Sequence, residues 1–134
     1  MINAENEIFN EIASVLRESF SNIYVTGEYV KAPPSFPCVS LVEIDNAVYR
    51  NSSTNCVEEN HVAVTYEVNI YSNKTSGKKT ECKAIADLVD TKLANLGFTR
   101  MGLNPIPNLE DSTIYRLSGR YRAVIGKDHT IYRR

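Results

Sequence analysis

The most informative stretch of this sequence is NHVAVTYEVNIY, which runs from Asn60 to Tyr71. Apolar residues occupy every second position, and the residues between them are small or polar. In a β-strand alternate side chains point to opposite faces, so this pattern predicts a strand with one core face and one partly wet face. Such strands are typical of antiparallel sheets. The predicted core face consists of Val62, Val64, Tyr66, Val68 and Ile70, and the other face of Ala63, Thr65, Glu67 and Asn69.

A second long strand with the same alternation is predicted from Thr113 to Ile125. Its core face contains Tyr115, Leu117, Tyr121, Ala123 and Ile125, and its other face contains Arg116, Ser118, Arg120 and Arg122. Gly126-Lys127-Asp128 predicts a turn and Thr130-Ile131-Tyr132 a short last strand.

Two helices are predicted from their apolar spacing. The first runs from about Ala4 to Phe20, with glutamates in its first turns, where the helix dipole favours acids. The second runs from about Lys78 to Leu96, with Gly97 placed to end it in a left-handed conformation. The residues expected to be buried in the first helix are Ile8, Ile12, Val15, Leu16 and Phe20. In the second helix they are Cys82, Ile85, Ala86, Val89, Leu93 and Leu96.

The remaining apolar runs predict shorter strands at 23–25, 38–44 and 98–101. Three prolines between Lys31 and Pro37 predict an extended loop, and Pro105 and Pro107 predict an edge or connector. The element order is then α-β-β-β-α-β-β(-β). We therefore expect one α+β domain over residues 1–134, with two helices packed on one face of a mainly antiparallel sheet.

No apolar period runs through residues 45–60, so this stretch predicts a long hairpin arm or a mobile loop that grips a neighbouring molecule. The residues expected to make that contact are Asn46, Tyr49, Arg50, Asn51, Asn55, Glu58 and Glu59.

Length and charge are those of an ordinary domain: 134 residues with a net charge of −1. The charge is unevenly spread, because residues 1–60 carry nine acids and three bases, and residues 100–134 carry seven bases and three acids. This pattern would arise from two unlike surfaces that meet between copies of the protein, from a basic binding surface, or from two solvated faces that differ in charge.

The acidic start lacks the features of a signal peptide, and the odd cysteine count implies no disulfide framework, so we expect synthesis in the cytosol. The cysteines Cys38, Cys56 and Cys82 are expected to be half-buried.

The sequence predicts neither a catalytic nor a metal site, and no cofactor. His61 and His129 have no nucleophile placed beside them, and Glu58-Glu59-Asn60-His61 lacks the helical spacing of metal ligands. Gly77-Lys78-Lys79-Thr80 resembles the end of a phosphate-binding loop, but the upstream glycine is missing. We therefore expect an assembly protein rather than an enzyme.

Arg116, Arg120 and Arg122 form the strongest polar signal, because alternation places them on one face of one strand. A solvated sheet face, an ion-pairing subunit interface or a surface facing nucleic acid would each account for them. Tyr115 and Tyr121 point to the opposite face, so we expect no aromatic platform for single-stranded nucleic acid among these arginines.

Several segments in this order resemble a known family. They are the N-terminal helix, the entry Pro33-Pro34-Ser35-Phe36-Pro37, the polar arm, the strand His61–Tyr71, the helix ending at Leu96-Gly97-Phe98, and Pro105-Ile106-Pro107-Asn108 followed by Ile114-Tyr115-Arg116 and Arg120-Tyr121-Arg122. The chain resembles the tail terminator, or tail completion, proteins of long-tailed bacteriophages and prophages.

The resemblance implies a structural virion protein assembled in the bacterial cytoplasm. Such a protein forms a homo-oligomeric ring, typically of six copies, that caps the tail tube and joins it to the head connector. Its partners would be the tail tube protein and the connector protein, with DNA only in passage and no membrane. The arginines would face a neighbouring subunit or the channel. The alternatives are another phage neck or head-completion protein, or a small nucleic-acid-binding α+β module.

Overall fold

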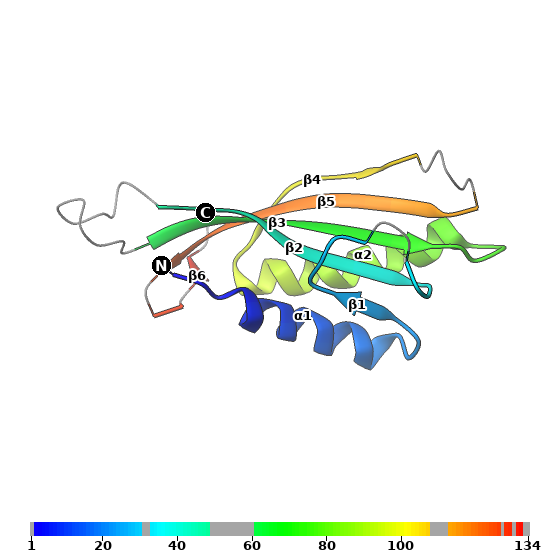
Figure 1. The fold of residues 1–134 in the computed structure, drawn as a ribbon, viewed down its shortest axis with the longest axis horizontal. Helices are drawn as coiled ribbons and strands as arrows, with labels where there is room; N and C mark the ends of the chain where they lie inside the picture. The colour runs from blue at the N-terminus through cyan, green and yellow to red at the C-terminus, as the bar shows by residue number, and fades with distance from the viewer. Residues whose placement is uncertain are drawn as a thin grey trace.

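The computed structural model describes residues 2–30, 33–48, 61–107, 113–126, 128–129 and 131–132. Its elements, in chain order, are α1 (Glu5–Ser19), β1 (Tyr24–Thr26), β2 (Cys38–Val48), β3 (His61–Ser72), α2 (Lys78–Leu96), β4 (Thr99–Pro105), β5 (Tyr115–Gly126) and β6 (Ile131–Tyr132) (Figure 1). The strands form one sheet in the order β1-β2-β3-β5-β4, and β6 pairs with β5. Only β1 and β2 pair in parallel; the other described pairs are antiparallel. The predicted α+β fold and element order are confirmed.

Helix α1 buries one narrow stripe. Ile8, Ile12 and Leu16 are buried at the expected spacing, while Val15 and Phe20 are only half-buried. The helix ends where Phe20 becomes extended, and the Phe20 N–H still bonds to the Leu16 carbonyl at 2.8 Å.

Helix α2 has the predicted bounds and ends as predicted. Gly97 has φ of 109°, and its N–H and that of Phe98 both bond to the Leu93 carbonyl, at 3.1 and 2.9 Å. Only glycine adopts this backbone conformation without strain, and the turn satisfies carbonyls that a helix end leaves unpaired. The chain then enters β4 directly.

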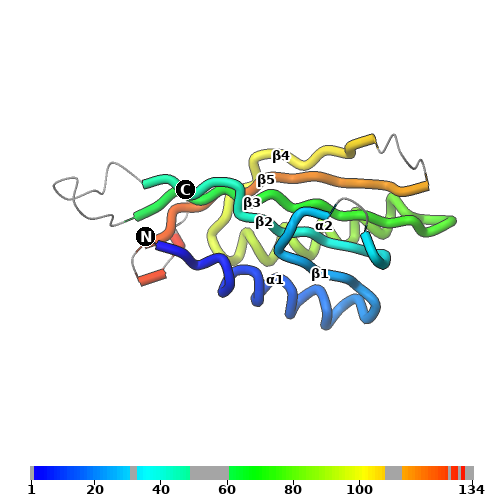
Figure 2. The backbone as a smooth tube through the Cα atoms, in the orientation of Figure 1, coloured from blue at the N-terminus to red at the C-terminus, as the bar shows by residue number. Residues whose placement is uncertain are grey.

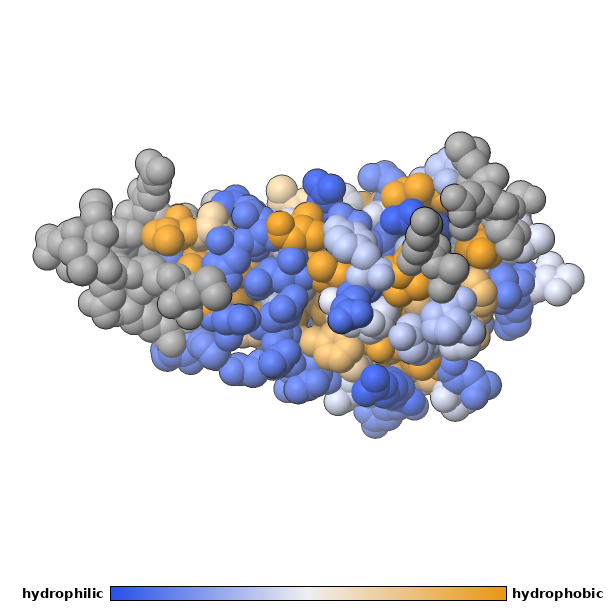
Figure 3. Space-filling model, in the orientation of Figure 1, coloured by the Kyte–Doolittle hydropathy of each residue, from blue (hydrophilic) through white to orange (hydrophobic). Residues whose placement is uncertain are grey.

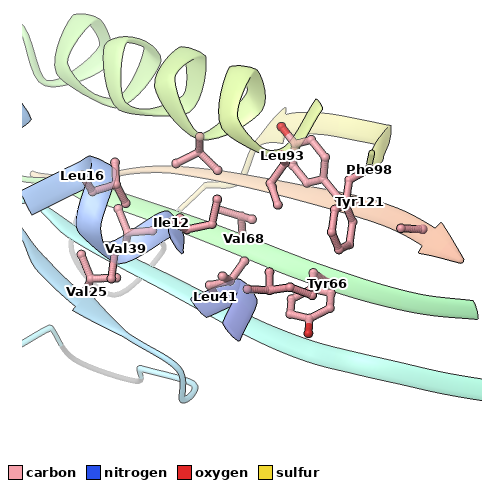
Figure 4. Packing of buried hydrophobic residues seen from close by; sticks show 14 of the residues in the cluster. Ile12, Leu16, Val25, Val39, Leu41, Tyr66, Val68, Leu93, Phe98 and Tyr121 are labelled. Atoms are coloured by element: carbon pink, nitrogen blue, oxygen red, sulfur yellow. The ribbon is translucent and has the colours of Figure 1, made fainter. Parts of the chain in front are cut away.

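The hydrophobic core lies between the two helices and one face of the sheet (Figure 4). Tyr66 on β3 and Tyr121 on β5 are among its largest fully buried side chains. The rings of Tyr66 and Phe98 meet edge to face with centroids 5.5 Å apart, a favourable arrangement of two aromatic quadrupoles. Both described helices pack on this face of the sheet. The opposite face, which carries no helix in the described ranges, is called the helix-free face below.

Strand β2 is longer than predicted. It continues to Val48, four residues beyond Ile44, and pairs with β3 as far as Val62. The pairing register shifts between Glu43 and Asp45, which breaks the alternation that a sequence pattern relies on.

This longer strand contains one expected contact residue. Asn46 lies in the paired part of β2, and its Nδ2 donates a hydrogen bond to the Ile2 carbonyl at 2.9 Å. It therefore ties the N-terminal segment to the sheet. The other expected contact residues lie outside the residues that the structure describes; they are Tyr49, Arg50, Asn51, Asn55, Glu58 and Glu59.

The β2–β3 pair runs past the ends of both helices at one end of the molecule (Figure 2). Val48, near the end of that extension, is 50% exposed. In the described ranges, no helix is long and apolar enough to span a membrane.

Candidate functional site

The helix-free face of the sheet carries the arginines singled out from the sequence. Leu117, Tyr121 and Ile125 of β5 are buried in the core, so the residues between them project from the other face. The structure therefore places Arg116, Arg120 and Arg122 together on the helix-free face. By register with β5, the β3 residues on this face are Thr65, Glu67, Asn69 and Tyr71.

Four of these side chains form a connected polar ladder, Arg116–Asn69–Glu67–Arg120. The Nε and Nη2 atoms of Arg116 donate to Oδ1 of Asn69, at 3.1 and 2.8 Å. Asn69 Nδ2 donates to Glu67 Oε1 at 3.0 Å, and Glu67 Oε2 lies 3.6 Å from Arg120 Nη2. Asn69 is fully buried, so these bonds supply partners that water cannot. The ladder thus links side chains of β3 and β5 on the helix-free face.

Tyr71 extends the ladder at one end. Its ring lies under the Arg116 guanidinium, with the Cζ atom 5.4 Å from the ring centroid, and its hydroxyl donates to the Val30 carbonyl at 3.5 Å. Burial raises the pKa of Tyr71, and the Arg116 charge partly opposes that rise. Tyr115 and Tyr121 point to the core face as expected, but Tyr71 of the neighbouring strand β3 brings one buried aromatic ring beside the arginines. The contact depends on the pairing of Tyr71 with Arg116 across two strands, which no local pattern reveals.

The charge of this face is mixed rather than purely basic. Glu67 lies between Arg116 and Arg120, and Asp45 pairs with Thr65 on the same face. The Arg120 side chain is 64% exposed, whereas that of Glu67 is 12% exposed. A partner would therefore meet an accessible arginine held in place by a largely buried carboxylate.

The loop after β1 covers one end of the helix-free face. Ser40 Oγ donates to the Glu28 carbonyl at 2.8 Å, which holds the loop on β2.

The two described cysteines are fully buried. Burial raises the pKa of the Cys38 thiol to about 11 and that of the Cys82 thiol to about 12. Both cysteines are more buried than the sequence predicted and are unreactive as thiolates at neutral pH. Cys56 lies outside the described residues.

A groove of about 320 Å³ lies between α2 and β4, on the helix side of the sheet. At one end, Asp90 Oδ1 accepts a hydrogen bond from the Tyr121 hydroxyl at 2.9 Å and lies 3.2 Å from Arg100 Nη1. Burial and the neighbouring Asp90 raise the pKa of Tyr121. The full lining is Lys79, Lys83, Ala86, Asp87, Asp90, Arg100, Leu103, Pro105, Tyr115 and Leu117.

The histidines occupy structural positions. His129 has a positive φ of 64°, and its Nδ1 lies 2.7 Å from Glu7 Oε1 beside a second hollow of about 410 Å³ between α1 and the end of α2. His61 begins β3. Among the residues that the structure places, no group of three or more His, Cys, Asp and Glu residues is arranged to hold a metal ion.

In the space-filling view, hydrophobic residues lie in small groups among hydrophilic ones (Figure 3). Contacts made through the face seen there would be largely polar. Comparison of the sequence with models of known protein families and with curated proteins gives no match.

Proposed function

We propose that this chain is a structural virion protein of a long-tailed bacteriophage or prophage that closes the finished tail tube as a ring and forms the joint with the head connector. The ring has six copies if the usual number of the resembled family holds, and it assembles in the bacterial cytoplasm. The family resemblance suggests this role, and the helix-free face with its polar ladder is the observation that supports it best.

The ladder suits a protein contact for an energetic reason. Association costs free energy when long side chains must be ordered at the interface. Here two hydrogen bonds to Asn69 already hold Arg116, and Glu67 lies 3.6 Å from the exposed Arg120. Part of the ordering cost is therefore met before a partner arrives, and the partner gains a defined arginine to pair with.

A nucleic-acid-binding module is the weaker reading. Binding to a phosphate backbone draws on concentrated positive charge, whereas Glu67 and Asp45 lie among the arginines of this face. A subunit or tail-tube contact fits a mixed surface better, because both signs find partners and define the register. DNA would then meet the protein only in passage.

Genetic replacement tests this role. We expect that removing the coding sequence from the phage genome leaves heads and tails that do not join, as seen by negative-stain electron microscopy, and that the wild-type chain restores joined particles. Arg120→Glu reverses the exposed charge of the ladder without altering the core, so we expect it to restore few or none.

The matched control is Arg17→Glu, which makes the same charge change on an exposed position of α1, away from the helix-free face. It should restore joined particles as the wild type does. Full restoration by Arg120→Glu would show that the face is not the contact. Normal particles without the gene would overturn the proposed role itself.

A further inference from the structure

The groove between α2 and β4 is a part of the sheet that the two helices leave uncovered. The apolar side chains beneath it come from the helix side of the strands: Leu117 is buried, while Leu103 is only half-buried. Gly119 allows this shape, because a Cβ there would lie 2.8 Å from Leu103 Cδ1. The floor of the groove is therefore apolar, with Leu103 lying close to the backbone of Gly119.

Two lysines on its rim, neither of which belongs to a described ion pair, favour a particular ligand. Lys79 and Lys83 lie one turn apart in the first turns of α2, where the helix dipole disfavours cations. Both are exposed, and the groove carries three bases against two acids, of which Asp90 pairs with Arg100 and Asp87 is exposed one turn from Lys83. An acidic group presented beside an apolar one would complement both the rim and the floor.

The loop after β1, which is held against the helix-free face by bonds to Ser40 of β2 and Tyr71 of β3, presents such a pair. Tyr29 is 64% exposed, the highest value among the exposed large hydrophobic residues described, and Glu28 beside it is also exposed. The two residues follow β1, which is the far end of the strand order from β4 (Figure 1). Bonds from Ser40 Oγ to the Glu28 carbonyl, 2.8 Å, and from the Glu28 N–H to Thr26 Oγ1, 3.3 Å, hold this projection in place.

We propose that Tyr29 of one copy inserts into the α2–β4 groove of the next copy, where Glu28 pairs with Lys79 and Lys83. The projection lies on the helix-free face and the groove on the helix side. The two surfaces are therefore unlike, and the contact is head-to-tail, the kind that generates closed rings. This inference rests on the proposed ring and names the residues that join its subunits. In this contact the acidic Glu28 meets the two lysines, and the exposed Tyr29 ring enters the apolar groove.

Mixed-label cross-linking tests the contact directly. Equal amounts of the full chain in ¹⁴N and ¹⁵N forms would be mixed at high concentration, treated with a zero-length carbodiimide, which joins carboxylates to amines, and digested for mass spectrometry. We expect peptides that join Glu28 of one isotope to Lys79 or Lys83 of the other. Cross-linked oligomers that lack this pair would overturn the assignment.

Charge exchange provides the second test, measured as the dissociation constant in sedimentation equilibrium. We expect Glu28→Lys and Lys83→Glu each to weaken self-association, the combined variant to recover most of the loss, and Tyr29→Ala to weaken it by about tenfold or more. Glu18→Lys, a charge reversal at an exposed position of α1, is the control and should leave it unchanged.

The outcomes separate this inference from the proposed role. Self-association that is unaffected by all three single variants would overturn the docking of Tyr29 but leave a ring intact. A wild-type chain that stays monomeric at every concentration would also overturn this contact, while the gene-replacement experiment decides the role in the tail independently.

Discussion

Asn69 on β3 joins an arginine to a carboxylate from a fully buried position. Replacing it with alanine would leave the half-buried Arg116 guanidinium and Glu67 without their shared partner. A polar group deprived of its partner costs about 1–3 kcal/mol. We therefore expect Asn69→Ala to lower the free energy of unfolding, measured in urea, by an amount in that range.

Asn104→Ala is the matched control, because Asn104 lies on the same face but is exposed on the edge strand β4. Exposed substitutions of this kind usually stay within about 0.5 kcal/mol. Equal losses from the two variants would mean that the ladder contributes nothing specific to stability.

Glu43 is a second residue whose effect on stability can be isolated, in this case by measuring unfolding at several pH values. Burial raises its pKa, as does the nearby Glu5, while a hydrogen bond from the Tyr66 hydroxyl at 3.1 Å opposes the rise. A carboxyl whose folded-state pKa lies above its unfolded value binds its proton more tightly when folded. Its ionisation therefore costs stability above the folded pKa, and this cost vanishes below the unfolded value of about 4.3.

Glu43→Gln keeps an oxygen for the Tyr66 hydroxyl but removes the charge. We expect this variant to be more stable than the wild type at pH 7, and the difference to shrink as the pH falls toward 4, in urea unfolding at several pH values. Glu18→Gln, at an exposed position of α1, provides the comparison. A gain that did not depend on pH would rule out ionisation as its cause.

At the scale of elements, the two glycines that bound α2 form a natural pair. Both have positive φ, 86° at Gly77 and 109° at Gly97, where a side chain costs about 1–3 kcal/mol in strain. A Cβ on Gly77 would meet nothing within 4 Å, whereas one on Gly97 would lie 2.9 Å from Ile131 Cγ2. We expect both alanine variants to be destabilised, and Gly97→Ala by more, because it also pushes against β6.

Thermal unfolding of the two variants, followed by circular dichroism, measures that difference. The backbone term is nearly common to both positions, so the excess at Gly97 reports the contact between the end of α2 and β6. Equal shifts in melting temperature would mean that Ile131 moves aside without cost.

The sequence predicted the elements whose periodicity is unbroken. Helix α2 has the expected bounds because Cys82 to Leu93 keep one helical stripe and Gly97 ends it, and β3 lies within one residue of its predicted range. The end of β2 could not be predicted, because the register shift after Glu43 turns Asn46 toward the N-terminal segment. Of the candidate surfaces, the arginine face could be predicted, because the alternation of side chains along one strand is enough to place the three arginines together. The Tyr71–Arg116 contact and the groove above Gly119 depend on pairings between distant strands, which a local pattern does not contain.

At the scale of the molecule, one hydrophobic cluster joins both helices to the sheet. The cluster that contains Tyr66 of the sheet also contains Ile12 and Leu16 from α1 and Ile85 and Leu93 from α2. Elements that share a core lose their support together, so we expect a single cooperative unfolding transition. The chain has eight tyrosines and no tryptophan, and two of the tyrosines, Tyr66 and Tyr121, are fully buried in the core. Part of the tyrosine fluorescence therefore reports on the core.

Urea unfolding followed by tyrosine fluorescence and by far-ultraviolet circular dichroism should therefore give coincident curves. Leu16→Ala removes a fully buried side chain of α1 and should cost about 2–5 kcal/mol. Because α1 and α2 share the core, this loss should shift both curves equally and leave their slopes unchanged. If the curves separate, with helical signal lost before the tyrosines become exposed, then α1 unfolds on its own and the chain is not one cooperative domain.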